Sequence, residues 1–287
     1  MGVTSRMLRW RRAVLLAGVV VVVIALGFVI SNQVKVARSR AIGEAEAQER
    51  ARIRTELAAE LRPVTLSNCT LARIGSAHDG GYLMCANLLA GLESAYSYGI
   101  GGEDSWGCAV SRAHRVPVHQ YDCFELAPGP CEGAIFRPNV ECVGTAASVI
   151  DGRRFDTFAN QIARNGDRGR RLVVKMDVEG AEWDTILATP DEVFDAIGQM
   201  PMELHGVNEA RVLAAVRKLK THFHLVAVHF NNMACTADAH PLPAIVYQVL
   251  LVNKRIGLPG PPAPASPTPE SLMAPDDPAI PDCQAAR

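Results

Sequence analysis

Short apolar runs alternate with segments of helical pattern between residues 95 and 252, and this alternation restricts the fold more than any other feature. Such alternation predicts β-α-β units and a mainly parallel sheet. The last two apolar runs are joined by a loop without a helix, so they should pair as an antiparallel hairpin. The expected strands are residues 95–99, 116–122, 140–144, 172–177, 200–204, 224–229 and 245–252, and the expected helices are residues 104–115, 148–164, 181–189 and 208–221.

The N-terminal region predicts a membrane anchor. A basic segment, residues 1–12, precedes the uncharged residues 13–30. As a helix these eighteen residues would be about 27 Å long, close to the roughly 30 Å hydrocarbon core of a bilayer. A cleaved signal peptide is the alternative, but Lys35 and Arg38 follow where small residues would mark a cleavage site. We expect a single-pass signal anchor, with the following domain on the non-cytoplasmic side.

Two further flanks differ from the central region, residues 65–256, in composition. Residues 31–64 predict a charged helical stalk with one apolar stripe, Ile53, Leu57 and Leu61. This stripe indicates either a self-associating helix or a solvated spacer. Residues 257–287 hold nine of the eighteen prolines, so this tail is expected to be disordered.

Charge and cysteine content exclude some classes of function. The 29 Lys and Arg nearly balance the 30 Asp and Glu, so a nucleic-acid partner is not expected. The eight cysteines show no C-x-x-C pair, which argues against a metal cluster. In a non-cytoplasmic domain they could form disulfides; in the other interpretation they are mostly buried free thiols.

A glycine-rich turn follows the first expected strand of the sheet. Gly99, Gly101 and Gly102 would let the backbone turn sharply and approach a ligand, and the next helix would offer free N–H groups. These features suit a nucleotide-like cofactor. The dinucleotide fingerprint G-x-G-x-x-G fails at Asp104, which disfavours nicotinamide or flavin.

The next expected strand ends in a carboxylate about twenty residues later. Asp122 is the predicted acceptor of hydrogen bonds from both ribose hydroxyls of that cofactor, and Glu125 is its rival. A solvent-exposed acid without a ligand is the alternative. Cys123 and Phe124 are expected to form a wall against the adenine.

A second group of polar residues gathers where two later strands end. Asp177, Glu179 and Glu182 follow the strand at 172–177, and they could orient a cofactor's amino group, act as a base or bind a divalent cation; no metal site is predicted. Helix capping is the purely structural alternative. His205, at the end of the next strand, is a candidate base for an acceptor hydroxyl.

Residues 175–183, Lys-Met-Asp-Val-Glu-Gly-Ala-Glu-Trp, resemble the acidic signature of FkbM-type methyltransferases, especially their membrane-anchored branch. Weaker matches are residues 79–82, 97–101, 121–122, 203–205 and 247–253. The resemblance implies a Rossmann-like class I fold, S-adenosylmethionine as the cofactor and methyl donor, and a hydroxyl acceptor on a glycan, lipid-linked or small molecule. Cys123 stands where relatives often have Pro.

Two other functions remain open at the level of sequence. The anchor, the stalk and the acid pair Asp177 and Glu179 are also compatible with a type II membrane glycosyltransferase that uses a metal-bound nucleotide sugar. A non-catalytic module that keeps the methyltransferase fold is the other alternative. The glycine turn followed by Asp122 favours the methyltransferase.

Overall fold

The structure is a computed structural model that describes residues 3–127, 129–262 and 267–283, with side chains of the first thirty residues given only at positions 10, 27 and 28. It divides into two compact units, Met1–Ala51 and Arg52–Arg287. Helix α1 (Val3–Glu60) forms the first unit and enters the second. Within the described residues no helix is long and apolar enough to span a membrane. The side chains of the expected anchor, residues 13–30, lie outside the described part of the chain except at positions 27 and 28, as do those of residues 1–9.

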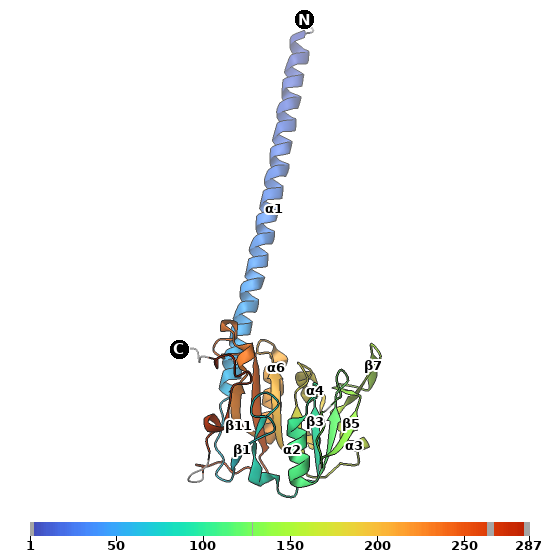
Figure 1. The fold of residues 1–287 in the computed structure, drawn as a ribbon. Helices are drawn as coiled ribbons and strands as arrows, with labels where there is room; N and C mark the ends of the chain where they lie inside the picture. The colour runs from blue at the N-terminus through green and yellow to red at the C-terminus, as the bar shows by residue number, and fades with distance from the viewer. Residues whose placement is uncertain (1–2, 128, 263–266, 284–287) are drawn as a thin grey trace. The chain divides into compact units, whose positions relative to one another are not determined.

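A single seven-stranded sheet forms the centre of the second unit, in the order β11-β12-β10-β9-β3-β4-β5 (Figure 1). The pairs β10/β9, β9/β3, β3/β4 and β4/β5 are parallel, whereas β12 is antiparallel to both β10 and β11. This confirms the expected α/β class, the mainly parallel sheet and the antiparallel hairpin, and it is compatible with a Rossmann-like fold. The strands are β3 (Ser94–Tyr98), β4 (Pro117–Tyr121), β5 (Ile135–Asn139), β9 (Leu172–Met176), β10 (Ile197–His205), β11 (Phe223–Phe230) and β12 (Val246–Asn253).

Helices cover both faces of the sheet because its strands are apolar on both sides. On one face, Ala95 and Val173 pack with α2 residues Trp106 and Val110. The other face forms the largest hydrophobic cluster. The helices of the domain are α2 (Ser105–His114), α3 (Phe158–Arg164), α4 (Glu182–Ala188), α5 (Asp191–Phe194), α6 (Ala210–His222) and α7 (Pro269–Leu272), with short 3-10 turns at Ala86–Leu89, Asn232–Ala234 and Ala237–Ala239.

The apolar stripe of the expected stalk packs into this domain. Ile53, Leu57 and Leu61 are 3%, 0% and 4% exposed and belong to the largest cluster. Lys220 of α6 donates to a carboxylate oxygen of Glu60 over 2.7 Å. The last turns of α1 are therefore part of the domain, and the stripe is not free to pair with a second chain.

Two small sheets lie outside the central one. The hairpin of β1 (Leu71–Ile74) and β2 (Tyr82–Cys85) is joined to β10, since the Cys85 N–H donates to Gln199 Oε1 over 2.8 Å. The other small sheet has the order β6-β8-β7, with β6 (Cys142–Gly144), β7 (Ser148–Ile150) and β8 (Arg153–Thr157).

Two sequence predictions fail around this second small sheet. The run 140–144 yields β6, and the edge strand of the central sheet is the earlier β5, which contains Pro138. Residues 148–157 form the hairpin β7–β8 instead of the first half of a helix. Asp151 and Gly152, both with positive φ (48° and 77°), make the tight turn of this hairpin.

All eight cysteines lie within the described residues and are paired in four disulfides, so the interpretation as free thiols is wrong. Each bridge closes a loop of moderate length, with sequence separations from 16 to 48 residues. Disulfides of this number are typical of proteins that mature in an oxidising compartment. The pairs are Cys69–Cys85, Cys108–Cys131, Cys123–Cys142 and Cys235–Cys283.

Candidate functional site

The glycine turn lies where β3, β4 and β9 present their carboxyl ends. Gly99, Gly101 and Gly102 all have positive φ, at 75°, 55° and 86°. A side chain on Gly99 would collide with the backbone, because its Cβ would lie 1.6 Å from the carbonyl oxygen of Asp177. The contact brings the turn after β3 directly against the acidic segment after β9.

Asp122 holds this turn in place through its carboxylate. Oδ2 accepts the N–H groups of Ile100 (2.8 Å) and Gly101 (3.2 Å). Oδ1 accepts those of Phe124 (2.7 Å) and Glu125 (2.9 Å). Burial alone would raise the pKa of Asp122, but these four hydrogen bonds outweigh it and hold the pKa below its usual value.

The expected ribose contact of Asp122 does not fit this arrangement. A carboxylate offers about four lone-pair sites, and four backbone N–H groups already use them. Asp122 is therefore a positioning residue. Glu125, its rival, lines the same cleft with an exposed side chain and lies beside Gly102, where an added Cβ would meet Glu125 Oε1 at 3.2 Å.

The cleft has a volume of about 580 Å³, within the range of small-molecule sites. It is lined by most of the residues predicted from sequence: Gly99, Gly101, Asp122, Cys123, Phe124, Asp177 and Glu179. Gly102 instead lines a separate hollow of about 830 Å³ beside α2. Glu182 and His205 are not among the residues that line the 580 Å³ cleft. Phe155 does line this cleft and was not expected from sequence.

The two residues of the expected adenine wall, Cys123 and Phe124, both line the cleft. Cys123 is bonded to Cys142, which ties the loop after β4 to the small sheet across the cleft. Phe124 is 77% exposed, and the guanidinium of Arg153 lies 4.3 Å from the centre of its ring. An aromatic face and a cation thus stand at the mouth of the cleft.

Asp177 is fixed at the inner wall by two neighbours. The Tyr82 hydroxyl donates to Oδ2 over 3.0 Å, and Lys175 Nζ lies 3.6 Å from the same oxygen. Lys175 also donates to the carbonyl oxygens of Tyr98 and Gly99. Lys175 thereby joins the ends of β3 and β9, while Asp177 presents its carboxylate to the cleft.

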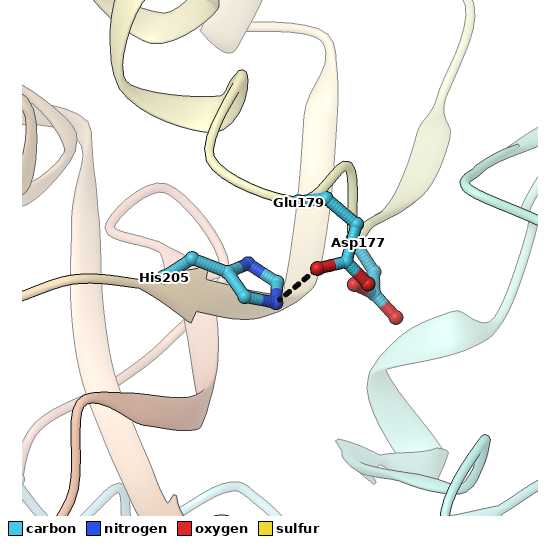
Figure 2. Close-up of side chains that lie close together, drawn as sticks. All are labelled: Asp177, Glu179 and His205. Atoms are coloured by element: carbon cyan, nitrogen blue, oxygen red, sulfur yellow. Dashed lines mark ion pairs between the residues drawn. The ribbon is translucent and has the colours of Figure 1, made fainter. Parts of the chain in front are cut away.

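His205 lies between two carboxylates. Its Nδ1 is 2.9 Å from Glu182 Oε1, and its Nε2 is 3.4 Å from Glu179 Oε2 (Figure 2). The Glu182 side chain is completely buried, whereas the Glu179 side chain is 86% exposed. Asp177 joins this group, since one ligand atom from each of Asp177, Glu179 and His205 lies within 4.8 Å of the others.

Helix capping, the structural alternative for the acids, is not observed at α4 (Glu182–Ala188). Glu182 Oε1 accepts the N–H of Val178 over 2.9 Å, but Val178 precedes the helix. The N-cap residue, Ala181, has no side-chain cap bond. Neither Asp177 nor Glu179 caps the helix, so capping does not explain why they are present.

The protonation of His205 does not match the expected base. Burial alone would lower the pKa of this ring, but the hydrogen bond to Glu182 and the charges of Asp177 and Glu179 raise it to about 9. At neutral pH the imidazole therefore holds its proton. In that form the ring has no lone pair to accept a proton from an acceptor hydroxyl.

Glu203 is a buried acid that the sequence interpretation named only as part of a motif. Asn231 and Gln248 donate to its two oxygens over 3.0 and 3.3 Å. Burial, together with repulsion from Asp177, raises the pKa of Glu203 to about 7. The period of two along a strand places Glu203 and His205 on the same face of β10, and that signal was available in the sequence.

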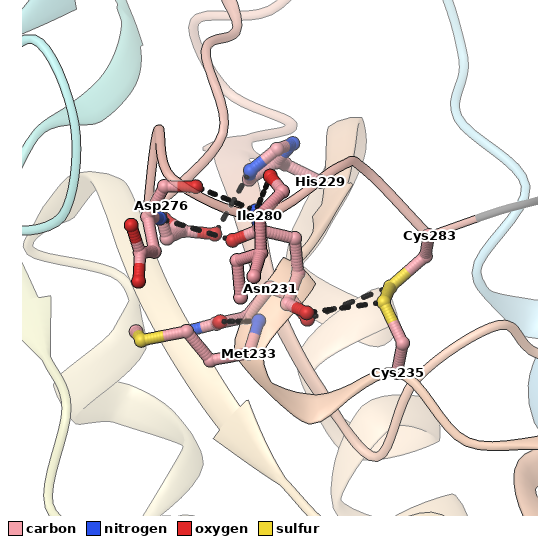
Figure 3. Close-up of a disulfide and its surroundings, with 9 residues drawn as sticks. His229, Asn231, Met233, Cys235, Asp276, Ile280 and Cys283 are labelled. Atoms are coloured by element: carbon pink, nitrogen blue, oxygen red, sulfur yellow. Dashed lines mark hydrogen bonds and ion pairs between the residues drawn. A yellow bond between two sulfur atoms is a disulfide. The ribbon is translucent and has the colours of Figure 1, made fainter.

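Residues 267–283 of the tail pack against the domain and differ from the expected disorder. Asp276 is 4% exposed and lies 3.0 Å from His229 Nε2 (Figure 3). The disulfide Cys235–Cys283 fastens the segment beside Asn231. A buried carboxylate and a covalent bond explain why a Pro-rich segment is ordered here.

The tail also touches the loop that borders the cleft. The N–H of Asp79 donates to the carbonyl oxygen of Asp276 over 3.4 Å, and His78 Nδ1 lies 2.8 Å from that of Pro275. Asp79 lines the cleft.

Compared with known proteins, the sequence matches no protein-family model and no curated protein. The resemblance to FkbM-type methyltransferases therefore depends on the motif residues alone.

Proposed function

We propose that the chain is an S-adenosylmethionine-dependent O-methyltransferase that acts on a glycan, lipid-linked or small-molecule hydroxyl. The observation that carries the proposal is the cleft at the carboxyl ends of β3, β4 and β9, bordered by a glycine turn and by acids. Ligands bind at this edge in open α/β sheets. The strand order, five parallel strands followed by an antiparallel pair, agrees with the class I methyltransferase layout.

The charge of the cleft suits this donor. S-adenosylmethionine carries a sulfonium and an ammonium group, and the wall offers the carboxylates of Asp79, Asp177 and Glu179. The ribose hydroxyls would hydrogen-bond to Glu125, because Asp122 is occupied by the turn. In the reaction an acceptor oxygen bonds to the methyl carbon, the carbon–sulfur bond breaks and its electron pair stays on sulfur. The hydroxyl proton leaves to water in the cleft or to one of the carboxylates that line it, Asp177 or Glu179.

Four disulfides support a position of the domain in an oxidising, non-cytoplasmic compartment. With residues 13–30 as an anchor, this corresponds to a type II single-pass membrane protein. S-adenosylmethionine is made in the cytosol, so such an enzyme would depend on imported donor. A glycosyltransferase is the second candidate, favoured by one observation, the grouping of Asp177, Glu179 and His205.

Calorimetry on the full-length, oxidised chain tests the proposal. S-adenosylmethionine and its demethylated product should each bind with one-to-one stoichiometry in the presence of a chelator. Glu125→Gln should weaken binding about tenfold, since one lost hydrogen bond to a charged group contributes roughly 1.5 kcal/mol. Asp184→Asn, an exposed acid that pairs with Arg211 outside the cleft, is the matched control and should bind normally. A folded chain that binds neither compound refutes the methyltransferase.

A further inference from the structure

We infer that Asp177, Glu179 and His205 form a binding site for one divalent cation at the inner wall of the cleft. The three side chains come from two neighbouring strand ends, after β9 and at the end of β10 (Figure 2). Two carboxylates and one imidazole suit Mn²⁺, which accepts both oxygen and nitrogen ligands. The inference deepens the proposed function, on which it rests for the identity of the acceptor.

The distances between the three candidate ligand atoms are close to those between ligand atoms around a bound cation. With bonds of about 2.1 Å, ligand atoms on opposite sides of a cation are about 4.2 Å apart. The three candidate atoms lie within 4.8 Å of one another, and His205 Nε2 and Glu179 Oε2 are 3.4 Å apart. Shifts of less than 1 Å would therefore complete the site, and the Glu179 side chain, 86% exposed, is free to make them.

The neighbours of Asp177 leave one of its oxygens available. Tyr82 and Lys175 both approach Oδ2. Within the described residues no hydrogen bond reaches Oδ1. Lys175 Nζ also donates hydrogen bonds to the carbonyl oxygens of Tyr98 and Gly99, so its positive charge is shared with these two oxygens. A cation can bind Oδ1 without displacing either neighbour.

Glu182 supplies a second, independent observation. Its side chain is fully buried and is directed at the far side of the His205 ring, with Oε1 2.9 Å from Nδ1. Oε2 is buried without a hydrogen-bond partner in the described part of the chain. A buried carboxylate with an unpaired oxygen is costly unless positive charge lies nearby. A carboxylate that accepts Nδ1–H and orients the ring is the usual support of a metal-binding histidine, and a cation that binds Nε2 takes the place of the proton there.

A cation at this position would hold an oxygen of the acceptor. Asp177 and Glu179 line the cleft, so the open coordination positions face the space where substrates would bind. A bound cation lowers the pKa of a coordinated hydroxyl. This would assist removal of the proton of the acceptor hydroxyl.

The test uses Mn²⁺ alone with the full-length, oxidised chain after removal of metals by a chelator. Electron paramagnetic resonance should report one bound Mn²⁺ per chain, with a nitrogen coupling from the imidazole. Glu179→Gln, at an exposed side chain that folding does not require, should weaken binding about tenfold or more and keep the nitrogen coupling. His205→Gln should abolish the coupling. Glu182→Gln should weaken binding roughly 10- to 100-fold, as expected for a carboxylate that supports a ligand.

Asp184→Asn, an exposed acid in the first turn of the same helix, is the matched control and should bind Mn²⁺ as the unchanged chain does. The inference is overturned if the folded chain takes up no stoichiometric Mn²⁺ up to about 1 mM, the weak limit of functional cation sites. Binding without nitrogen coupling, or binding unaffected by Glu179→Gln, also overturns it.

The outcomes separate this inference from the proposed function. A chain that binds S-adenosylmethionine in chelator but no Mn²⁺ lacks the cation site and remains a candidate methyltransferase. A chain that binds Mn²⁺ but no S-adenosylmethionine keeps the site, and the glycosyltransferase then becomes the better assignment.

Discussion

Replacement of Asp122 by Asn isolates the part that this residue plays in the glycine turn. The amide keeps one acceptor oxygen, so one pair of backbone N–H groups stays bonded and the other pair faces an NH₂ group. Hydrogen bonds to a charged group contribute about 1.5–3 kcal/mol each when shielded from water. The pair from Phe124 and Glu125 is exposed and can be hydrated instead, so we expect a net destabilisation of about 1–2 kcal/mol.

The pH dependence of this loss follows from the lowered pKa of Asp122. A carboxylate whose pKa is lower in the folded chain stabilises it above the unfolded-state pKa of about 3.9, and this stabilisation disappears as the pH falls through the folded-state pKa. The difference between Asp122→Asn and the unchanged chain should therefore be full at pH 7. It should shrink in acid, as the pH falls through the lowered folded-state pKa of Asp122 and the carboxylate becomes neutral.

Denaturant unfolding, followed through the fluorescence of the buried Trp106 and Trp183, measures this difference at each pH. Glu125→Gln serves as the control, because it removes a neighbouring charge but none of the four hydrogen bonds. Its stability should stay within about 0.5 kcal/mol of the unchanged chain. Equal stabilities of Asp122→Asn and the unchanged chain at pH 7, or a difference that grows in acid, would refute the role given to Asp122.

Three further outcomes follow from the packing and the disulfides. Leu57→Ala should lower the free energy of unfolding by about 2–5 kcal/mol, while Ile42→Ala, at a 51% exposed position, should change it by less than about 0.5 kcal/mol; similar values would mean that α1 does not pack on the domain. Cys235→Ser should cost about 2–4 kcal/mol and speed hydrogen exchange in residues 273–283, and unchanged exchange there would contradict the fastening of the tail. Peptide mapping without reduction should find all eight cysteines in four bridges, and a single alkylated thiol in the folded protein would count against them.

The sequence predicted the central sheet well, because buried parallel strands are continuous apolar runs that few other structures produce. The sequence prediction is wrong around β5 to β8, where the spacing of apolar residues does not distinguish a helix from a strand. The pattern predicts a helix at residues 148–164, although Asp151-Gly152 is a typical turn of a β-hairpin. The sequence does not predict β5, because this strand is half exposed and contains Pro138.

The candidate site could be located from sequence but its internal bonding could not. Strand ends and glycines placed Gly99, Asp122 and Asp177 at one edge, and the structure brings them together in one cleft. Which oxygen bonds to which N–H depends on the loop after β4, and this made Asp122 a support of the turn rather than a ribose ligand. Similarly, the pairing of Cys123 with Cys142 depends on two loops whose approach no local pattern encodes.

The edge strand β5 has a consequence for how the domain meets other molecules. An exposed sheet edge offers unpaired N–H and C=O groups to which a strand from another chain can add. Pro138 has no N–H to offer, and the neighbouring Arg137 places an exposed charge on the same strand. This end of the sheet is thereby protected against strand addition and the aggregation that follows from it.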